Sequence, residues 1–203
     1  KGERLVNWDP HFKTAISDLE VENIEVDGYF WHIKYPLKNE ENYDYIEQDE
    51  NGIISFKDNR NYISIATTKP ETMLGDGAIA VHPDDKRYKN IIGKEVIIPI
   101  ANRAIPIIAD EYPDPNFGSG AVKITGAHDF NDYSVAKKHK LDFFKLMDES
   151  ACLLNEDFIP KKYRGLERFK AREILVEELD KAGFLLKTEQ KKIIQPFGDR
   201  SKV

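Results

Sequence analysis

Residues 118–132, GSGAVKITGAHDFND, hold the densest group of side chains that could do chemistry. A small-residue turn at 118–120 leads into a short β-type run, followed by a cation (Lys123), a hydroxyl (Thr125) and two carboxylates (Asp129 and Asp132). Glycines let a backbone approach a ligand closely, and carboxylates three residues apart at a helix start share one face. The pattern indicates a site for a small zwitterionic substrate. A structural interpretation is compatible with it, with Asp129 as a helix N-cap and Asp132 as a first-turn acid.

A second polar segment, residues 67–73 (TTKPETM), follows an apolar stretch typical of a strand. Its hydroxyl and ammonium groups can hydrogen-bond a ribose, a phosphate or a carbonyl oxygen; they belong to Thr67, Thr68, Lys69 and Thr72. The structural alternative is a strand end that Pro70 breaks and the threonines cap. The segment by itself leaves both interpretations open.

The sequence argues against metal and covalent chemistry. Of the five histidines only His128 has carboxylates beside it, and Cys152, the single cysteine, cannot supply a thiolate set. A metal-dependent hydrolase built on His128, Asp129 and Asp132 is kept as an alternative. No serine lies in a nucleophile-elbow pattern, and the glycines match neither a dinucleotide fingerprint nor a Walker A loop. Neither NAD nor ATP is therefore expected.

Composition bounds the class of protein. A chain of 203 residues, 40% hydrophobic and 33% charged, fits one globular domain with a core of its own. The single cysteine suits a reducing cytosol, and no apolar run reaches the length of a membrane span, so we expect a cytoplasmic protein. The net charge of −6 is uneven, because residues 161–203 carry 12 Lys and Arg against 7 Asp and Glu. A nucleic-acid partner is therefore expected to bind local patches.

Short β-type segments separated by Gly, Pro, Asn and Asp predict a small barrel or sandwich. They are residues 24–26, 29–35, 53–56, 62–67, 78–81, 96–100, 104–108 and 121–124. Asp27–Gly28 and Asn51–Gly52 are turn dipeptides. Helices are predicted from His82, from about 129 to 139, and from about 166 to 182.

The two ends have similar strand-like sequences, RLVNW at 4–8 and KIIQP at 192–196. If they pair, the ends of the chain lie together, as in a domain inserted into a host protein. We therefore expect a single domain over 1–203, excised from a larger protein, with 1–22 and 190–203 as strands that link it to the host.

Several stretches together resemble the editing domain of valyl-tRNA synthetase, the insertion called connective polypeptide 1 in this class I enzyme. They are TTKPETMLGDGAIAVHPDDKRY, ADEYPDPNFGSGAVKITGAHDFNDYSVAKKH, YRGLERFKAREILVEELDKAGFL, RLVNWDP, TAISDLEVE and PFGDRS. The resemblance is collinear over nearly the whole chain. It implies a mainly β (α+β) fold, a closed Greek-key β-barrel with peripheral helices. Isoleucyl and leucyl relatives share the threonine-rich and GTGAV-type motifs, so an editing domain of one of them is an alternative.

The resemblance implies post-transfer editing, the hydrolysis of the aminoacyl ester of mischarged Thr-tRNA(Val), with threonine recognised by its hydroxyl. It assigns catalysis to Asp129, which holds the substrate ammonium, together with Lys69 and Thr72. It assigns substrate binding to Thr67, Thr68, Phe117, Lys123, Thr125 and Asp132. Lys69, Gly77 and Gly126 depart from the family, which usually has Arg, Thr and Pro there.

The implied reaction needs no metal and no cofactor. The adenylation signatures HIGH and KMSKS are absent from the chain, so ATP would serve only a synthetic site elsewhere, and this fragment alone should not charge tRNA. The expected partners are the 3′ end of tRNA(Val) carrying threonine and the rest of the synthetase in cis, with no membrane and a monomeric state. A module that docks the tRNA 3′ end without hydrolysis is a further alternative.

Overall fold

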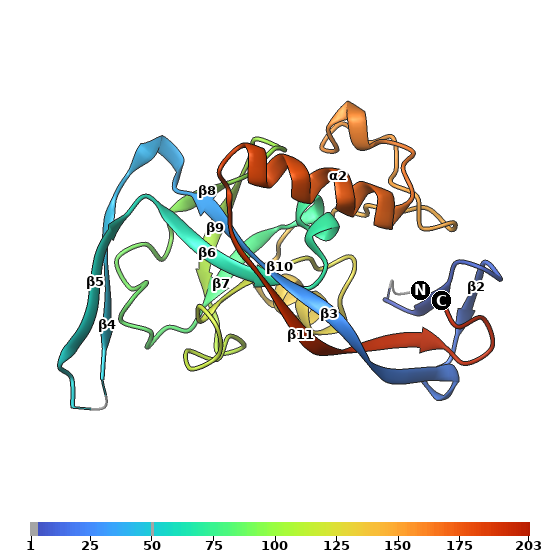
Figure 1. The fold of residues 1–203 in the computed structure, drawn as a ribbon, viewed down its shortest axis with the longest axis horizontal. Coiled ribbons are helices and arrows are strands. Elements are labelled where there is room, and N and C mark those ends of the chain that lie inside the picture. The colour runs from blue at the N-terminus through green and yellow to red at the C-terminus, as the bar shows by residue number, and fades with distance from the viewer. Residues whose placement is uncertain (1–3, 50) are drawn as a thin grey trace.

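A computed structural model describes residues 4–49 and 51–203 and shows a mainly β molecule with helices at its periphery (Figure 1). The strands are β1 (Asn7–Asp9), β2 (Thr14–Ile16), β3 (Val21–Pro36), β4 (Tyr43–Gln48), β5 (Ile54–Arg60), β6 (Tyr62–Thr67), β7 (Ala78–Val81), β8 (Glu95–Ile98), β9 (Arg103–Ala109), β10 (Ala121–Ile124) and β11 (Leu185–Gly198). The helices are α1 (Phe130–His139) and α2 (Arg168–Lys181), with 3₁₀ turns η1 (Asp18–Glu20), η2 (Lys38–Glu40), η3 (Pro70–Gly75) and η4 (Lys161–Tyr163).

Two sheets form the body. One has the order β10-β7-β9-β8 and the other β11-β3-β6; β7 and β9 are parallel, and the other pairs are antiparallel. A bridge between Leu37 and Val96 joins the sheets on one side. On the other side no ladder links β6 to β10 among residues 4–49 and 51–203, so the expected closure of the barrel is not seen. There the chain leaves β6 at Thr67 and turns into η3, whose Thr72 side chain contacts Lys123 of β10.

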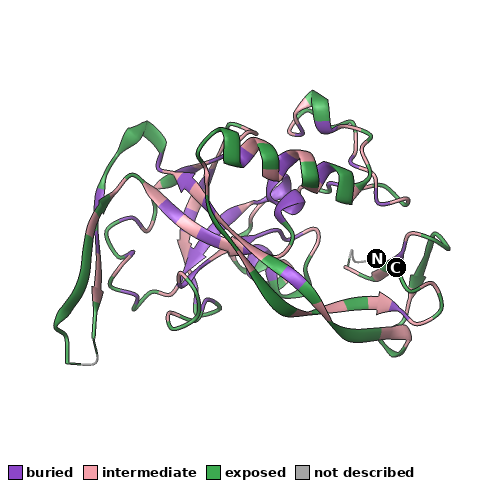
Figure 2. Cartoon of the chain, in the orientation of Figure 1, coloured by how far each residue is buried: buried purple, intermediate pink, exposed green. Residues whose placement is uncertain are grey.

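The core lies between these sheets. Alternate residues of β6 point inward, and Ile63 and Ile65 are fully buried together with Ile33 of β3 and Ile79 of β7. Burying one such side chain stabilises the fold by roughly 1.5–3 kcal/mol. The other face of β7 and β10 forms a second cluster, in which small side chains let α1 pack closely. The body is buried, whereas most of β5 and much of the β3–β11 ribbon are exposed (Figure 2).

The helices predicted at about 129–139 and 166–182 both form, as α1 and α2. In α2 the predicted apolar face is buried at Ala171, Leu175 and Leu179, and Gly183 follows with φ of +75°, a backbone conformation that glycine tolerates. Ala182, the fourth predicted member of that face, is exposed at the helix end. No helix in the described part of the chain is long and apolar enough to cross a membrane.

Two local predictions are wrong. No helix begins at His82; a series of turns follows instead, because the Asp85 carboxylate binds both the backbone N–H and the guanidinium of Arg87 and competes with helix formation. Asp27–Gly28 is not a turn but lies within β3. A Cβ at Gly28 would lie 2.4 Å from Ile193 Cδ1, so glycine there allows the close approach of β11. The Asn51–Gly52 turn is confirmed, with Gly52 at φ of +79°.

The two end segments do not pair with each other. β1 pairs with β2, whereas β11 pairs with β3 over nearly its whole length. The ends nevertheless lie together, since a Cβ at Gly198 would be 2.9 Å from Asp9 Oδ2, and the Asp199 N–H donates to Glu20 O at 2.8 Å (Figure 1). Residues 1–3 of the predicted first linker lie outside the described residues, and the division into body and linkers stays a prediction.

Candidate functional site

A buried polar cluster surrounds Lys123, which points from β10 toward the main core and is only 9% exposed. Its Nζ donates to Thr72 Oγ1 at 2.8 Å and to Asp76 Oδ1 at 3.1 Å, and it also contacts Thr125 Oγ1. An ammonium group has three N–H donors. Each donor of Lys123 therefore has an acceptor supplied by the protein itself.

Asp76 compensates the buried charge of Lys123. It is fully buried and accepts hydrogen bonds from Tyr35 Oη at 2.8 Å and Thr125 Oγ1 at 2.6 Å, in addition to Lys123. Burial, reinforced by the charge of Asp76, raises the pKa of Tyr35 well above its usual value, which keeps this phenol a neutral donor. Asp76 was not among the residues predicted for the site. Its signal was a lone acid two residues before the apolar segment 78–81, where a carboxylate that becomes buried needs a partner.

The two predicted carboxylates lie at the start of α1. Asp129 is the N-cap; its Oδ1 accepts the N–H groups of Asn131 at 2.9 Å and Asp132 at 3.2 Å, and its side chain is exposed. Asp132 is buried and accepts the Thr125 N–H at 2.8 Å. Burial raises the pKa of Asp132 to about 6, and the negative charges of Asp129 and Asp76 add to this rise. The capping interpretation is therefore confirmed for Asp129.

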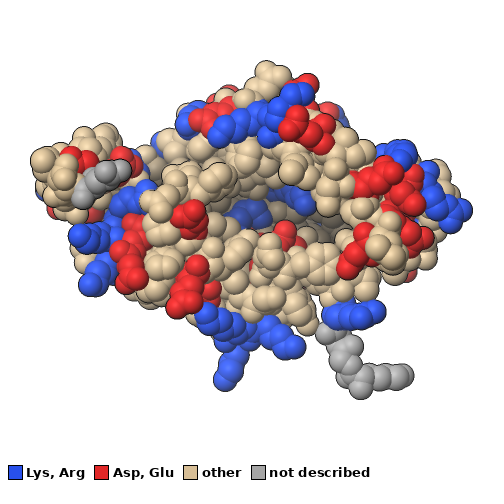
Figure 3. Space-filling view, turned by 90° about the horizontal axis from the view of Figure 1, so that it is seen from below, with Lys and Arg blue, Asp and Glu red and all other residues tan. Residues whose placement is uncertain are grey.

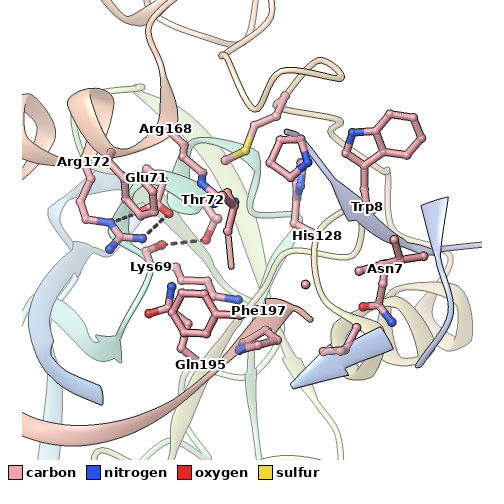
Figure 4. A pocket seen from close by; sticks show the side chains of 18 residues that line it. Asn7, Trp8, Lys69, Glu71, Thr72, His128, Arg168, Arg172, Gln195 and Phe197 are labelled. Atoms are coloured by element: carbon pink, nitrogen blue, oxygen red, sulfur yellow. Dashed lines mark hydrogen bonds and ion pairs between the residues drawn. The ribbon is translucent and has the colours of Figure 1, made fainter. Parts of the chain in front are cut away.

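A cleft of about 200 Å³ lies beside the cluster, between η3, the start of α2 and the two ends of the chain (Figure 4). Thr72 belongs to both cleft and cluster, and its Oγ1 donates to Lys69 O at 2.8 Å. Lys69, Glu71 and Arg172 also line the cleft, and Arg172 holds both oxygens of Glu71 at 2.7 Å. This bidentate pair ties α2 to η3. A hollow in the molecular surface likewise carries Lys and Arg atoms in its interior (Figure 3).

His128 lines the same cleft, and its protonation state follows from its contacts. Its Nε2 accepts the Leu146 N–H at 2.8 Å, so in the neutral ring the proton lies on Nδ1. Burial lowers the pKa of His128 to about 4, helped by the positive charges of Lys123 and Lys69. Among residues 4–49 and 51–203, no three His, Cys, Asp or Glu side chains come together in a way that could hold a metal ion. The proposed metal set of His128, Asp129 and Asp132 therefore has no geometric support.

The remaining predicted residues differ in placement. Thr67 Oγ1 accepts the Lys69 N–H at 3.1 Å and so shapes the entry into η3, and Thr68 is half-buried between them. Phe117 is 69% exposed on the loop before β10 and lies outside the hydrogen-bonded cluster. Gly126 is buried, and a Cβ there would lie 2.6 Å from Ala136 Cβ, which explains a glycine at this position.

Comparison with known proteins shows the family to which this fold belongs. Residues 84–195 match the family model described as the editing domain of leucyl-tRNA synthetase. The chain therefore belongs to the aminoacyl-tRNA synthetase editing-domain family. Its curated relatives include valine–tRNA ligases. Those of Ruegeria pomeroyi and Caulobacter vibrioides are 49% and 52% identical over 100% of this chain, which covers 26% and 22% of their lengths.

A solved structure supports the fold. The LeuRS of Agrobacterium radiobacter K84, crystallised as a ternary complex with tRNA and LeuAMS, matches with a TM-score of 0.50 and 18% identity. The match covers 85% of this chain and 21% of that one. This chain thus spans about a quarter of the length of its relatives.

Proposed function

We propose that this chain edits mischarged tRNA by hydrolysing the aminoacyl ester of Thr-tRNA(Val). One observation carries the proposal: a buried ammonium–hydroxyl–carboxylate cluster opens at Thr72 into a cation-lined cleft. The high identity to valine–tRNA ligases favours the editing domain of a valine enzyme over that of a leucyl or isoleucyl enzyme. Charging of tRNA would belong to the part of the ligase outside this chain.

The cluster supports selection for a hydroxyl group. A synthetic site shaped for valine admits the nearly isosteric threonine, and the valine enzyme is itself the standard example of this problem. Here a substrate hydroxyl would exchange with Thr72 or Thr125 as a partner of Lys123. The methyl group of valine would displace that threonine oxygen without replacing it and leave one N–H of Lys123 unpaired, at a cost of about 1–3 kcal/mol.

The proposed reaction uses water as the nucleophile. Water attacks the ester carbonyl carbon, the carbonyl oxygen becomes an oxyanion, and the ribose oxygen leaves with a proton to give threonine and tRNA. In this scheme Asp129 holds the substrate ammonium, and Lys69 with Thr72 lies beside the ester. Orientation and electrostatic support of the oxyanion supply the rate enhancement, so the scheme requires neither metal nor cofactor.

The proposed partners are the 3′ end of threonylated tRNA(Val) and the remainder of the ligase. The solved LeuRS relative binds tRNA, which supports a tRNA partner here. A monomer acting in the cytoplasm remains our expectation.

Paired substitutions of Asp129 test the proposal. Asp129→Asn keeps an oxygen that caps α1 but removes the negative charge, whereas Asp129→Ala removes both. We expect both variants to lose most deacylation of Thr-tRNA(Val), with only the alanine variant losing about 1 kcal/mol of stability. Wild-type deacylation rates in both variants would reject the assigned role of Asp129.

A docking module without hydrolytic activity is the second candidate. The saturation of all three donors of Lys123 favours it, because a substrate must displace an internal partner. It predicts that a non-hydrolysable threonyl-adenosine analogue shifts NMR signals at 69–72 and 123–132, while the corresponding ester is not turned over. Turnover of that ester by the chain would discard it.

A further inference from the structure

Two cations in the cleft lack a close carboxylate within the described part of the chain. Arg172 is committed to Glu71, whose two oxygens it holds at 2.7 Å. The ion pair of Arg168 is much looser, with 4.0 Å between its Nε and Glu167 Oε1. Lys69, which is exposed, forms no ion pair among residues 4–49 and 51–203. The cleft therefore presents positive charge that its own walls do not neutralise.

Arg168 is held partly out of water. Its side chain is 27% exposed, and burial lowers its pKa despite the nearby charges of Glu167 and Glu71. A guanidinium is a planar fork of donors that matches a phosphate better than a point charge does. An anion entering the cleft would meet this fork of donors.

An aromatic face lies directly beside the guanidinium. The Arg168 guanidinium carbon lies 4.6 Å from the centre of the Phe169 ring, and that of Arg172 lies 5.0 Å from it. Phe169 is 41% exposed and lines the cleft. Positive charge combined with exposed aromatic rings is the chemistry that binds single-stranded nucleic acid, since phosphates meet cations and bases stack on rings.

Arg168 and Phe169 line the same cleft as Thr72, so a strand bound at these two residues can lead to Thr72. The Glu71–Arg172 pair connects the first turns of α2 to η3, so Arg168 and Thr72 belong to the walls of one cleft (Figure 4). The amide groups at the start of α2 are not the source of the charge. Glu167 caps them, accepting from Phe169 N at 2.9 Å and Lys170 N at 3.2 Å.

We infer that Arg168 and Phe169 form a backbone-binding subsite for the single strand whose 3′ end reaches Thr72. Arg168 binds a phosphodiester of that strand, and Phe169 stacks against a base. The inference rests on the proposed function and adds the residues that hold the nucleic acid upstream of the ester.

Binding of the RNA trinucleotide CCA, with no amino acid attached, tests the subsite without requiring hydrolysis. Arg168→Gln should weaken binding about tenfold and reduce the slope of log affinity against log salt by about 0.7, the value for one phosphate contact on a single strand. Phe169→Leu should weaken binding about tenfold with the salt slope unchanged. Lys170→Gln is the matched control, because Lys170 is exposed on the same turn and pairs with Glu173 at 2.9 Å.

Ester substrates separate this inference from the proposed function. Arg168→Gln should lower kcat/KM for threonyl-CCA about tenfold and leave that for threonyl-adenosine, which has no phosphate, unchanged. If the wild-type chain hydrolyses neither ester, the proposed function fails, and trinucleotide binding still decides the subsite. The inference is overturned if the wild-type chain does not bind CCA. It is also overturned if Arg168→Gln matches Lys170→Gln in affinity and salt slope, or impairs both esters equally.

Discussion

The buried cluster around Lys123 and the cleft around Arg168 meet at Thr72 but treat their cations in opposite ways. In the cluster, the ammonium of Lys123 has three internal acceptors, and a fully buried carboxylate, Asp76, balances its charge. In the cleft, Arg168 and Lys69 have no close carboxylate among the residues described. The polar groups of the first region satisfy one another, whereas the cations of the second region face a cleft.

Under the proposed function, this difference suits the two regions to different tasks. A hydrogen-bond network that is fully satisfied in a low-dielectric interior holds its atoms in place. It selects among ligands because a ligand that enters must replace the hydrogen bond that it displaces. Cations that lack a close carboxylate beside an open cleft attract an anion without giving up a strong internal ion pair. We therefore propose that the cluster selects the amino acid and that the cleft binds the nucleic acid.

The largest expected effect comes from removing the carboxylate that balances Lys123. Asp76→Ala should destabilise the fold by about 3–5 kcal/mol, because it leaves an ammonium buried without a counter-charge. Urea denaturation measures the change. The matched control is Asp84→Ala, whose side chain is 92% exposed and should change stability by no more than about 0.5 kcal/mol.

A double mutant sharpens this test. Adding Lys123→Met to Asp76→Ala should recover much of the lost stability, since the unpaired charge is removed as well. If the two changes simply add, Asp76 and Lys123 are not coupled, and the description of the cluster as a balanced unit is wrong.

A smaller effect is expected from Asp132 and depends on pH. Because burial raises its pKa from 3.8 to about 6, the folded protein binds this proton more tightly than the unfolded chain does. Its contribution to stability is therefore full below pH 3.8 and is lost as the pH rises through about 6. Asp132→Asn, which stays neutral, should gain stability relative to wild type between pH 4 and pH 8, by at most about 3 kcal/mol. A difference that stays constant over this range contradicts the prediction.

The smallest effect on stability is expected at Phe117. Since its side chain is 69% exposed, Phe117→Ala should change the free energy of unfolding by less than about 0.5 kcal/mol. If Phe117 lines the pocket as the resemblance implies, the same variant should raise KM for the threonyl ester several-fold. Unchanged KM and stability together would remove Phe117 from the site.

Much of the fold could be read from local patterns. The segments 62–67, 78–81 and 121–124 form strands with the predicted bounds, and the apolar spacing of Ala171, Leu175 and Leu179 marks the buried face of α2. The predictions for 62–67 and α2 hold because side-chain periodicity reports which face is buried, whereas 78–81 is a continuous apolar run that is buried on both faces. The helix predicted from His82 does not form because the Asp85 carboxylate accepts the Arg87 N–H, which a helix would donate to a backbone carbonyl.

The sequence alone determined the mainly β class, the two helices that carry caps, and the polar residues that had to serve either a site or a cap. Only the tertiary structure decided that Tyr35, Asp76 and Lys123 form one buried network and that Glu71 pairs with Arg172 across 101 positions of sequence. It also decided that Arg168 lies beside the cleft, where its one ion pair among the residues described, with Glu167, is as long as 4.0 Å. The physical reason is that a charge is compensated by whatever the fold brings within a few ångströms of it, and sequence spacing does not report that distance.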